Sequence, residues 1–419
     1  MAAGYFAAGR QNDVGTFEFT IRELPRHRDF VLAAGLHRAV EYLLNLNFTE
    51  EEIQYLRTLE NFSNAPSGFW DYLRGFRFTG DVFAVPEGTV MYAGQPVMNV
   101  RAPLIEAQIP ETYLLSAITF ETLIATKGAL MTRAAQGRDV IEFGTRRAHT
   151  PEAGALGARA AYIGGCAGTS NTQAGFQFGI PVMGTAAHSW VMSFESETEA
   201  FRHLQQLLGN NTVQLLDTYD TLDGARVAAE LGKPLWGVRL DSGNIPELAR
   251  EVRRILDSAG LPDAKIMASG DLDEKKIAAI LDAGAPVDAF GVGTELATSR
   301  DAPAMGSIYK LVEIEHAGRT RHTAKHSTDK ETLPGAKQLF RFPDYDLLGL
   351  HHECAGGSEA MLRPVVIGGR LIEPLPSAAQ IRERARTALN PWPSGKRHTG
   401  RSLGLRKLEE EMRAIDVPA

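Results

Sequence analysis

The sequence predicts a mixed α/β fold, with a domain of parallel strands and helices and a smaller strand-rich region. The main observation is a repeated pattern between about residues 139 and 300. There an apolar run, a turn rich in Gly, Ser, Thr or Asp, and an amphipathic helix follow one another several times. Such alternation implies parallel strands, either in a barrel or in an open sheet. The second observation is a different texture before about residue 115 and after about residue 301, where short strand-like runs prevail.

The N-terminal region mixes strands and helices. Phe17–Ile21 alternates apolar and polar residues, as a half-buried strand does. Val82–Val100 is a series of short apolar runs broken by glycine and proline, which indicates hairpin-like strands. The stretch from Pro110 to about Ala135 has the apolar spacing of a helix.

The central region contains the repeated units. The expected strands are Val140–Ile141, Val213–Leu216, Leu235–Leu240, Lys265–Ala268 and Val287–Val292, and the expected helices are Pro151–Ile163, Ser196–Leu208, Leu222–Leu231, Pro246–Ala259 and Asp273–Ala283. The last region is less regular: strands are expected at Ile308–Ile314 and Met361–Val366, and a polar helix at Leu403–Ile415.

Composition narrows the function class. The 419 residues suffice for two or three domains, and a net charge of −7 disfavours a general nucleic-acid binder. Cys166 and Cys354 are too few for a disulfide framework or a four-cysteine zinc site, and they suit a reducing cytoplasm. Met1–Gly15 lacks a sustained apolar core, and no run of about 18 apolar residues occurs, so we expect neither a signal peptide nor a membrane span.

The first chemically informative turn is Glu142–Arg147, directly after an expected strand. Such turns lie at the carboxyl ends of parallel strands, where active sites are built. Arg146 and Arg147 beside a glycine can hold phosphates or a carboxylate, and Phe143 can stack on a flat ring. The alternative is a surface basic pair with a core phenylalanine.

The next turns contain an amide, a histidine and a carboxylate. Gly168–Asn171 precedes a helix, so its backbone N–H groups can receive an anion, or Asn171 can simply cap the helix. His188 follows a short strand among small residues and is either a ligand or a hydrogen-bonded structural histidine. Asp217 ends the next strand. It can accept a proton from one His188 nitrogen and leave the other nitrogen free as a nucleophile.

The turn Arg239–Gly243 combines a cation with a carboxylate. Arg239 and Asp241 are two residues apart, so they face the same side of a strand. Arg suits a phosphate or carboxylate and Asp suits ribose hydroxyls, although a structural ion pair is the alternative. Two further turns, Ser269–Asp271 and Gly291–Thr294, follow the next strands. A glycine-rich turn late in a barrel commonly binds phosphate.

Other candidate sites are weaker. His351, His352 and Cys354 offer three possible ligands, but nothing nearby in the sequence completes a metal site. No Walker-type phosphate loop occurs, so any use of ATP must rely on other groups.

Taken together and in order, these turns resemble nicotinate phosphoribosyltransferases. The similarity covers about residues 5 to 375 and is dense from 140 to 340. The matching stretches are Phe143–Ala148, Gly168–Asn171, Gly184–Ser189, Leu216–Thr221, Arg239–Gly243, Phe290–Thr294, Tyr309–Val312 and Pro334–Gln338.

The resemblance implies the architecture and the reaction. The fold would be an irregular α/β barrel of the type II phosphoribosyltransferase kind with a smaller strand-rich α+β domain. The implied division is 1–115 as the N-terminal domain, 116–334 as the barrel, and 335–419 as a segment packing back on the N-terminal domain. A homodimer with interface active sites would join nicotinate and phosphoribosyl pyrophosphate in NAD biosynthesis. ATP hydrolysis would be coupled through a phosphorylated histidine. Mg²⁺ would be bound mainly through substrate phosphates, without a site made by protein side chains alone.

The same resemblance assigns roles to residues of this chain. His188 matches the phosphorylated histidine and Asp217 the carboxylate that supports it. Phe143 matches the aromatic ring that stacks on the base, and Arg146 and Arg239 match the lining of the base site. The remaining matches are Asp241, Gly270 and Asp271 to ribose contacts, Gly293 and Thr294 to the phosphate loop, and Arg22 to a basic residue near the phosphates.

Asn171 distinguishes the substrates, because the relative that uses nicotinamide has an acid at this position. A carboxylate there would repel nicotinate, whereas Asn can donate a hydrogen bond. The alternatives are therefore nicotinamide phosphoribosyltransferase and, in another class, a non-catalytic phosphosugar-binding relative. A quinolinate phosphoribosyltransferase would need no phosphorylatable histidine and would want a more cationic base site.

Two departures from the family pattern are visible. The family has an Asp-x-Tyr element that helps to enclose the base across the dimer. Here Met1 begins inside that helix and Tyr5 does not match the tyrosine. We therefore expect either a start farther upstream or a half-open base pocket. Some microbial relatives also have a cysteine-rich zinc knob near the C-terminus, which Cys354 alone cannot form.

Overall fold

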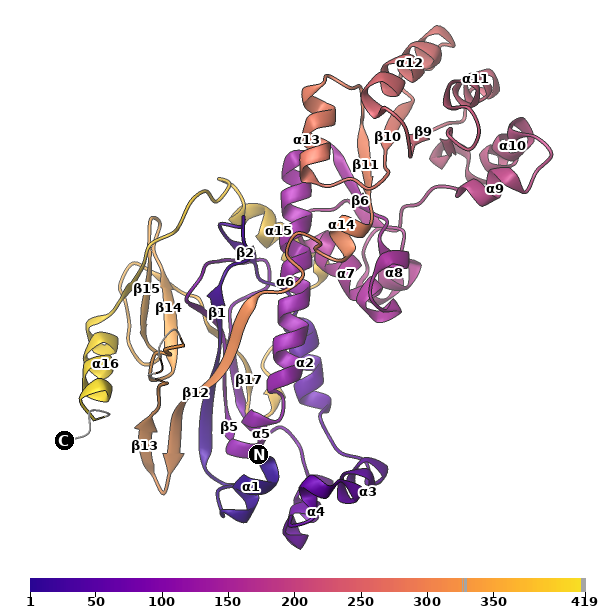
Figure 1. The fold of residues 1–419 in the computed structure, drawn as a ribbon. Helices are drawn as coiled ribbons and strands as arrows, with labels where there is room; N and C mark the ends of the chain where they lie inside the picture. The colour runs from indigo at the N-terminus through magenta and orange to yellow at the C-terminus, as the bar shows by residue number, and fades with distance from the viewer. Residues whose placement is uncertain (326, 328–329, 416–419) are drawn as a thin grey trace. The chain divides into compact units, whose positions relative to one another are not determined.

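The computed structural model describes residues 1–325, 327 and 330–415, and the chain divides into two compact units (Figure 1). The first unit comprises Met1–Thr122, Ala304–Pro376 and Thr387–Ala419, and the second comprises Leu123–Pro303 and Ser377–Arg386. The sequence had placed residues up to 334 with the barrel. Residues from Ala304 instead belong to the first unit, because β12 (Gly306–His316) pairs antiparallel with β1 (Val14–Glu23) along nearly its whole length.

The second unit is built on six parallel strands. They are β6 (Asp139–Glu142), β7 (Gly168–Thr169), β8 (Val213–Leu215), β9 (Gly237–Leu240), β10 (Lys265–Ala268) and β11 (Ala289–Val292). Their order in the sheet is β7-β6-β11-β10-β9-β8, and every neighbouring pair is parallel. The predicted α/β class is confirmed. The sheet is a half-barrel with β7 and β8 as its edge strands.

Helices follow these strands as the sequence pattern predicts. They are α7 (Pro151–Ile163), α8 (Thr172–Phe178), α9 (His188–Met192), α10 (Glu197–Leu208), α11 (Thr221–Leu231), α12 (Ile245–Ser258), α13 (Glu274–Asp282) and α14 (Thr294–Ala297). Side-chain oxygens fix several starts, because Thr150, Ser196, Asp220 and Asp273 each accept a hydrogen bond from a backbone N–H of the first turn.

The first unit contains three sheets. The largest has the order β13-β12-β1-β5-β3-β17-β18, a second has the order β16-β14-β15-β19, and β2 pairs with β4. The bounds of the strands not yet given are β2 (Val31–Leu32), β3 (Asp81–Ala84), β4 (Val90–Met91), β5 (Gln95–Pro103), β13 (Arg319–His322), β14 (Lys337–Arg341), β15 (Asp346–Leu350), β16 (Glu359–Ala360), β17 (Arg363–Ile367), β18 (Arg370–Leu371) and β19 (Thr399–Arg401).

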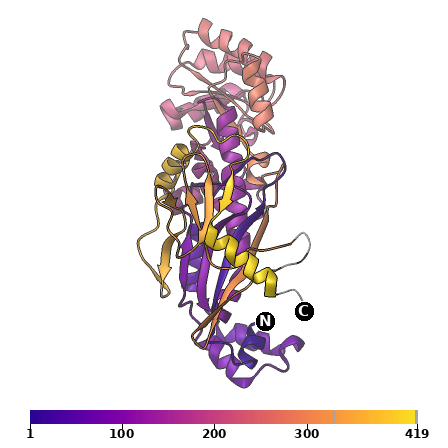
Figure 2. The same cartoon turned by 90° about the vertical axis from the view of Figure 1, so that its left-hand side faces the viewer.

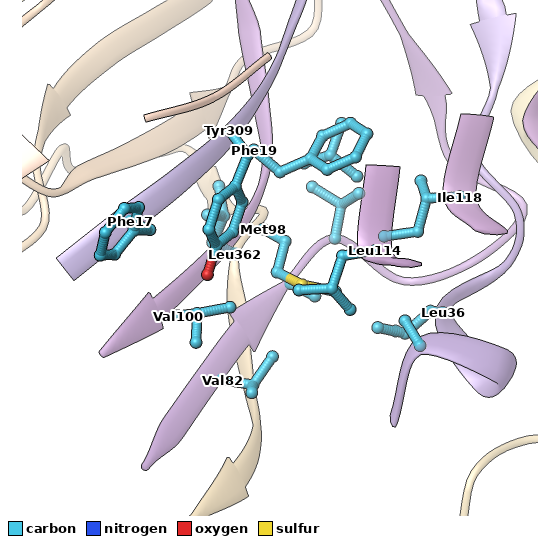
Figure 3. Close-up of a cluster of buried hydrophobic side chains, with 14 of the residues drawn as sticks. Phe17, Phe19, Leu36, Val82, Met98, Val100, Leu114, Ile118, Tyr309 and Leu362 are labelled. Atoms are coloured by element: carbon cyan, nitrogen blue, oxygen red, sulfur yellow. The ribbon is translucent and has the colours of Figure 1, made fainter. Parts of the chain in front are cut away.

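The core of the first unit lies against β1, which is buried on both faces rather than half-buried. On one face Phe17 stacks on Tyr309 with ring centroids 5.1 Å apart (Figure 3). On the other face the carboxylate of Glu18 lies 3.3 Å from the ammonium of Lys337 on β14. The alternating pattern correctly predicts a strand at β1. It does not predict that the polar face of β1 is covered by a second sheet, because that sheet comes from distant parts of the sequence.

The remaining helices are α1 (Ala2–Ala7), α2 (Leu36–Asn45), α3 (Glu50–Thr58), α4 (Ser67–Arg74), α5 (Leu104–Gln108), α6 (Glu111–Ala134), α15 (Ala378–Ala388) and α16 (Leu403–Ile415). The C-terminal helix α16, yellow in Figure 2, buries Leu405 and Leu408 in the core of the first unit. Leu104–Ala134 is the one stretch of the described chain that is long and apolar enough to cross a membrane, and it is a core helix with 67% of its apolar window buried.

Candidate active site

The turns that the sequence analysis singled out lie at one edge of the half-barrel. Because all six strands are parallel, their carboxyl ends share that edge. Phe143 directly follows β6, Asp241 follows β9 and Ser269 follows β10. Gly293 follows β11 and is the residue before α14. Contacts between these turns join most of the predicted residues into one cluster.

Arg239 is the centre of this cluster. Its Nε donates to Ser269 Oγ at 2.8 Å, Nη1 donates to Thr185 Oγ1 at 2.8 Å, and Nη2 donates to Asp241 Oδ1 at 2.6 Å. The side chain is only 14% exposed. Three of its five N–H donors are thus used within the protein, which fixes the orientation of the guanidinium and leaves two donors for a ligand.

Phe143 lies beside Arg239 on the same sheet edge. The guanidinium carbon is 5.6 Å from the centre of the phenyl ring, within the range of a cation–π interaction. The ring also lies against Gly291 of β11, since a Cβ at that glycine would come within 2.7 Å of two ring carbons. The glycine of the next strand therefore makes the space that the ring occupies.

Asp241 is ionised by its surroundings. Burial alone would raise the pKa of this carboxyl, but a hydrogen bond from Ser269 and the charge of Arg239 outweigh burial and hold the pKa below its ordinary value. Ser269 Oγ donates to Oδ1 at 2.6 Å. The other oxygen, Oδ2, lies 3.7 Å from His188 Nε2. Oδ2 is thus the oxygen left for a further partner.

His188 is the first residue of α9 and its side chain is 38% exposed. Its Nδ1 lies 3.2 Å from the hydroxyl of Thr218, and its Nε2 faces Asp241. The sequence had predicted a hydrogen bond with Asp217. In this structure the neighbouring Thr218 takes that position, because the end of β8 turns the Asp217 carboxylate toward the following strand.

Asp217 is held by the turn after β9. Its Oδ2 accepts from the Ser242 hydroxyl at 2.5 Å and from the backbone N–H of Asp241 at 3.3 Å. Its other oxygen, Oδ1, is buried and has no hydrogen-bond partner in the part of the chain that the structure describes. A buried carboxylate oxygen without a partner is costly, so a ligand or a rearranged side chain is its natural complement.

The turn after β6 is held by a buried carboxylate. Glu142 accepts from Thr169 Oγ1 at 2.5 Å and from the backbone N–H of Gly144, and burial raises the pKa of its carboxyl. Asn171 caps α8 through Oδ1, which accepts from Ala174 N, while Nδ2 donates to Thr145 Oγ1 at 3.0 Å. The capping alternative for Asn171 is therefore present, and one amide N–H remains for a ligand.

Arg146 differs from Arg239 in that no partner within the described part of the chain holds its guanidinium. It lies in a short 3-10 turn (Thr145–Arg147) and is exposed. Among the described residues its guanidinium has no hydrogen bond or ion pair. Arg146 directly follows Thr145, the hydrogen-bond partner of Asn171, in the chain.

Two turns that contain glycine follow β10 and β11 at the same edge of the sheet. Gly270 has a φ of +97°, and a Cβ there would come within 2.1 Å of the Asp241 carbonyl oxygen. Asp271 also has a positive φ of 48°, and its carbonyl accepts from Lys276 Nζ at 2.7 Å. Gly293 approaches the first turn, since a Cβ at Gly144 would come within 2.7 Å of the Gly293 oxygen. Thr294 begins α14.

Arg22 belongs to the first unit, apart from these turns. It lines a cavity of about 290 Å³ that also includes Lys310 and Lys337. Lys310 pairs with Glu111 at 3.6 Å, and Lys337 is buried and donates to two carbonyl oxygens. Within residues 1–325, 327 and 330–415, Arg22 has no ion pair and is available to an anion.

Several residues that build the site were quoted in motifs without a role. Ser269, Thr185 and Thr218 fix Arg239 or His188 through hydroxyl groups. Their only sequence signal is their place within the strand-end turns. No group of three or more His, Cys, Asp or Glu side chains suited to a metal occurs among the described residues, and both cysteines are free.

Comparisons with known proteins identify a family for both parts of the chain. A family model described as the nicotinate phosphoribosyltransferase (NAPRTase) N-terminal domain matches residues 1–119, and one described as the nicotinate phosphoribosyltransferase (NAPRTase) family matches residues 139–332. The chain is 43% identical over 405 residues to nicotinate phosphoribosyltransferase pncB2 of Mycobacterium tuberculosis, covering 94% of this chain and 85% of the relative.

More distant relatives extend the similarity. The nicotinate phosphoribosyltransferase of Homo sapiens is 31% identical, covering 93% of this chain and 89% of the relative. The crystal structure of human nicotinic acid phosphoribosyltransferase superimposes with a TM-score of 0.86 at 27% identity, over 99% of this chain and 98% of the other. A nicotinate-nucleotide pyrophosphorylase structure from Pyrococcus furiosus gives 0.77 at 26% identity, over 93% and 92%.

Proposed function

The chain belongs to the nicotinate phosphoribosyltransferase family, and we propose that it forms nicotinate mononucleotide and pyrophosphate from nicotinate and phosphoribosyl pyrophosphate in NAD salvage. The observation that carries this proposal is the fixed trio of an aromatic ring, a guanidinium and an ionised carboxylate at one sheet edge. Phe143, Arg239 and Asp241 supply these three groups.

Nicotinate is a flat ring with a carboxylate, and the site offers a partner for each part. The ring stacks on Phe143. The carboxylate binds guanidinium donors, of which Arg146 keeps all and Arg239 keeps two. The free N–H of Asn171 gives a further donor at the same turn.

Phosphoribosyl pyrophosphate occupies the neighbouring turns. Asp241 Oδ2 accepts a ribose hydroxyl. The turn Gly270–Asp271 packs closely on the Asp241 backbone, because Gly270 has no Cβ to meet the Asp241 carbonyl oxygen, and we assign its backbone to the same ribose. Gly293 and Thr294 hold the phosphate. These assignments come from the resemblance to the family, and their support here is that each residue lies in a turn after a strand of the half-barrel.

The reaction is a displacement at the anomeric carbon. The pyridine nitrogen attacks this carbon with its lone pair, and the bond to the diphosphate oxygen breaks, with its electrons leaving on the diphosphate. Positive charge builds on the ribose, where the ionised Asp241 stabilises it. The attacking nitrogen has no proton to lose, so the site needs no general base.

His188 is then free to couple ATP hydrolysis. One imidazole nitrogen attacks the γ-phosphorus, the bond to ADP breaks, and water later cleaves the nitrogen–phosphorus bond. The exposed position of His188 allows ATP to reach it. Asp217 is adjacent in the chain to the Thr218 partner of His188 and has the unpaired Oδ1, so it remains our choice for the carboxylate that stabilises the charged imidazole.

Magnesium would enter with the substrate phosphates. Its chemistry is to neutralise charge on the leaving diphosphate. The exposed carboxylate of Asp271, in a turn at the sheet edge, suits its shell of bound water. The protein's own contribution is to hold the diphosphate in place.

A homodimer with a shared site accounts for Arg22. This residue belongs to the first unit, and we assign it to the phosphates in the site of a second copy. The second unit has an exposed apolar patch around α8, where Phe176 is 88% exposed and Val182 51%. Such a patch suits burial against another subunit. The free cysteines agree with a reducing cytoplasm.

The main experiment is a product assay. The purified protein is incubated with phosphoribosyl pyrophosphate and nicotinate, nicotinamide or quinolinate, each with and without ATP. We expect nicotinate mononucleotide as the main product and more of it with ATP. A protein that binds ribose phosphates but makes no mononucleotide from any of the three is the non-catalytic relative instead.

ATP coupling is tested at His188. Incubation with γ-labelled ATP should give an acid-labile phosphohistidine in the wild type and none in His188→Ala. The variant should also lose the stimulation by ATP while its basal synthesis remains. Full ATP stimulation in His188→Ala would show that the coupling residue lies elsewhere.

The alternative substrate is nicotinamide, and Asn171 decides between the two. In Asn171→Asp the cap of α8 is kept, because Asp caps helices as well as Asn does. The new negative charge should therefore lower the preference for nicotinate over nicotinamide by about tenfold or more without unfolding the protein. An unchanged ratio of kcat/KM values would remove Asn171 from the base site.

A further inference from the structure

A buried lysine forms ion pairs with two segments, which follow the turns after β10 and β11. Lys127 lies on α6, and its side chain is 1% exposed. Its ammonium is 2.6 Å from Glu274 Oε2 and 2.9 Å from Asp301 Oδ1. All three residues belong to the second unit. Neither carboxylate comes from α6, so the lysine joins three separate segments of the chain.

The two carboxylates each follow a turn of the sheet edge. Glu274 is the first residue of α13 and comes three residues after Asp271 in the turn that follows β10. Lys276 in the same helix donates to the Asp271 carbonyl, so the start of α13 and the turn are one connected piece. Movement of Glu274 would therefore move the turn that we assign to ribose.

The second carboxylate follows the turn after β11. Gly293 and Thr294 begin α14, and Asp301 comes shortly after that helix ends. The segment between them is tied together, because Thr298 Oγ1 donates to the Thr294 carbonyl and Arg300 pairs with Glu295. Lys127 thus holds the far end of the segment that begins with the phosphate turn.

Stability alone does not explain a lysine at this position. The neighbouring α6 residues Ile124, Ala125, Ala129 and Met131 are buried and apolar. An apolar residue would pack there without the desolvation cost of burying an ammonium, whereas the side chains of Glu274 and Asp301 stay 24% and 35% exposed. The lysine binds both carboxylates and so fixes the distance between them, which an apolar side chain cannot do.

We propose that Lys127 is a positioning residue that sets the spacing between the ribose turn (Gly270–Asp271) and the phosphate turn (Gly293–Thr294). This inference rests on the proposed function, because the names of the turns come from it. Lys127 touches no substrate. It keeps the two turns at the separation that phosphoribosyl pyrophosphate spans, and a misplacement of about 1 Å in such a site can cost up to 100-fold in rate.

The test uses Lys127→Met with Lys265→Met as the matched control. Lys265 also links segments next to β10 and β11, through Asp288, but at their amino ends. We expect Lys127→Met to raise the KM for phosphoribosyl pyrophosphate about tenfold or more and to change the KM for nicotinate less than twofold. Labelling of His188 by ATP should stay at the wild-type level. Lys265→Met should match the wild type in both KM values and in the labelling of His188.

A purely structural role would give a different pattern. Equal losses for both substrates, lower labelling of His188, or an unchanged KM for phosphoribosyl pyrophosphate would each overturn the proposal. If Lys127→Met does not fold, Glu274→Gln and Asp301→Asn each release one turn and should show the same selective rise in KM. A rise in the KM for phosphoribosyl pyrophosphate alone in these variants supports a positioning role for Lys127. Equal changes for both substrates contradict that role.

A failed function and a failed inference are distinguishable. If the wild type makes no mononucleotide, the proposed function is wrong. Binding of ribose 5-phosphate and of pyrophosphate, measured by calorimetry on the wild type and Lys127→Met, then still decides the role of the lysine. Weaker binding in the variant supports it, and equal binding overturns it. If the wild type is active and Lys127→Met keeps its KM, only the inference fails.

Discussion

The two ends of the half-barrel strands carry similar charges but organise them differently. At the carboxyl ends Arg239 is 14% exposed and shares Ser269 and Asp241 with the neighbouring turn. At the amino ends Lys265 and Asp288 pair at 3.4 Å and are 49% and 37% exposed. An exposed pair contributes about 0–1 kcal/mol, whereas a desolvated network fixes each member through the others. A cation–carboxylate pair is therefore held in a fixed network at the carboxyl ends, whereas at the amino ends it is open to solvent.

The largest effect should come from Arg239→Lys. An ammonium keeps the charge but cannot donate to Thr185, Ser269 and Asp241 in the planar geometry of a guanidinium. We expect kcat/KM for nicotinate to fall by about 100-fold or more, with the fold retained. Steady-state kinetics check this against Arg254→Lys, an exposed arginine on α12 paired with Glu251. A loss below tenfold would mean that charge alone, without the network, suffices.

The second effect concerns packing at the same edge. In Gly291→Ala the new Cβ would lie 2.7 Å from the Phe143 ring, so the ring or the strand must move. Overpacking of this kind costs about 1–3 kcal/mol, and displacement of the ring should also raise the KM for nicotinate. Urea unfolding and kinetics measure the two. Gly356→Ala, where a Cβ meets nothing within 4 Å, is the control. Normal stability and KM would show that Phe143 is free to shift.

The sequence predicts the strands and helices of the half-barrel more closely than the contacts between their side chains. Strand positions such as Lys265–Ala268 and helix α7 were predicted to the residue, because apolar periodicity and proline are local signals. Once the end of each strand is predicted, the residues in the turn that follows it are known. The fold class and the placement of Phe143, Arg239 and Asp241 at one sheet edge could therefore be predicted from the sequence.

Side-chain partners were less accessible. The pairing of His188 with Thr218 rather than Asp217 depends on how the end of β8 turns, a tertiary property with no spacing rule. The same holds for Lys127, whose two carboxylates lie more than 140 residues away. Likewise, assigning Ala304 onward to the first unit required the pairing of β12 with β1.

A third region, at the start of α10, has a carboxylate, Glu197, without an ion pair among the described residues. Glu197 begins α10, near Asp220 and Asp223 at the start of α11, and its Oε1 has no hydrogen-bond partner among the described residues. Burial, and then the negative charges of Asp223 and Asp220, raise the pKa of Glu197 to about 7. Asp241, which has Arg239, keeps a lowered pKa at the same end of the unit. The difference is that Asp241 has a hydrogen-bond donor, Ser269, and a cation, Arg239, whereas Glu197 has burial and two negative neighbours.

This contrast predicts a pH-dependent effect of Glu197→Gln. Between pH 4.5 and about 7 the folded protein holds a proton at Glu197 that the unfolded chain has lost, so stability falls as pH rises through this window. The variant removes this loss. After allowance for solvent screening we expect it to be about 1–2 kcal/mol more stable than the wild type at pH 8 and equal to it at pH 4. Urea unfolding at both values measures the difference, with Glu199→Gln as the control. A pH-independent difference would contradict the raised pKa.

The smallest effect is expected at the amino ends. Lys265→Met removes one partner of an exposed pair, and the backbone pairing of β10 with β9 and β11 does not involve the ammonium. The free energy of unfolding should change by less than about 0.5 kcal/mol, and the change should shrink further between 0.05 and 0.5 M salt because screening weakens the pair. Urea unfolding at both salt concentrations measures this. A loss above about 1 kcal/mol, or an altered KM for either substrate, would mean that the amino ends also set the geometry of the site, because strands only four residues long transmit a shift from one end to the other.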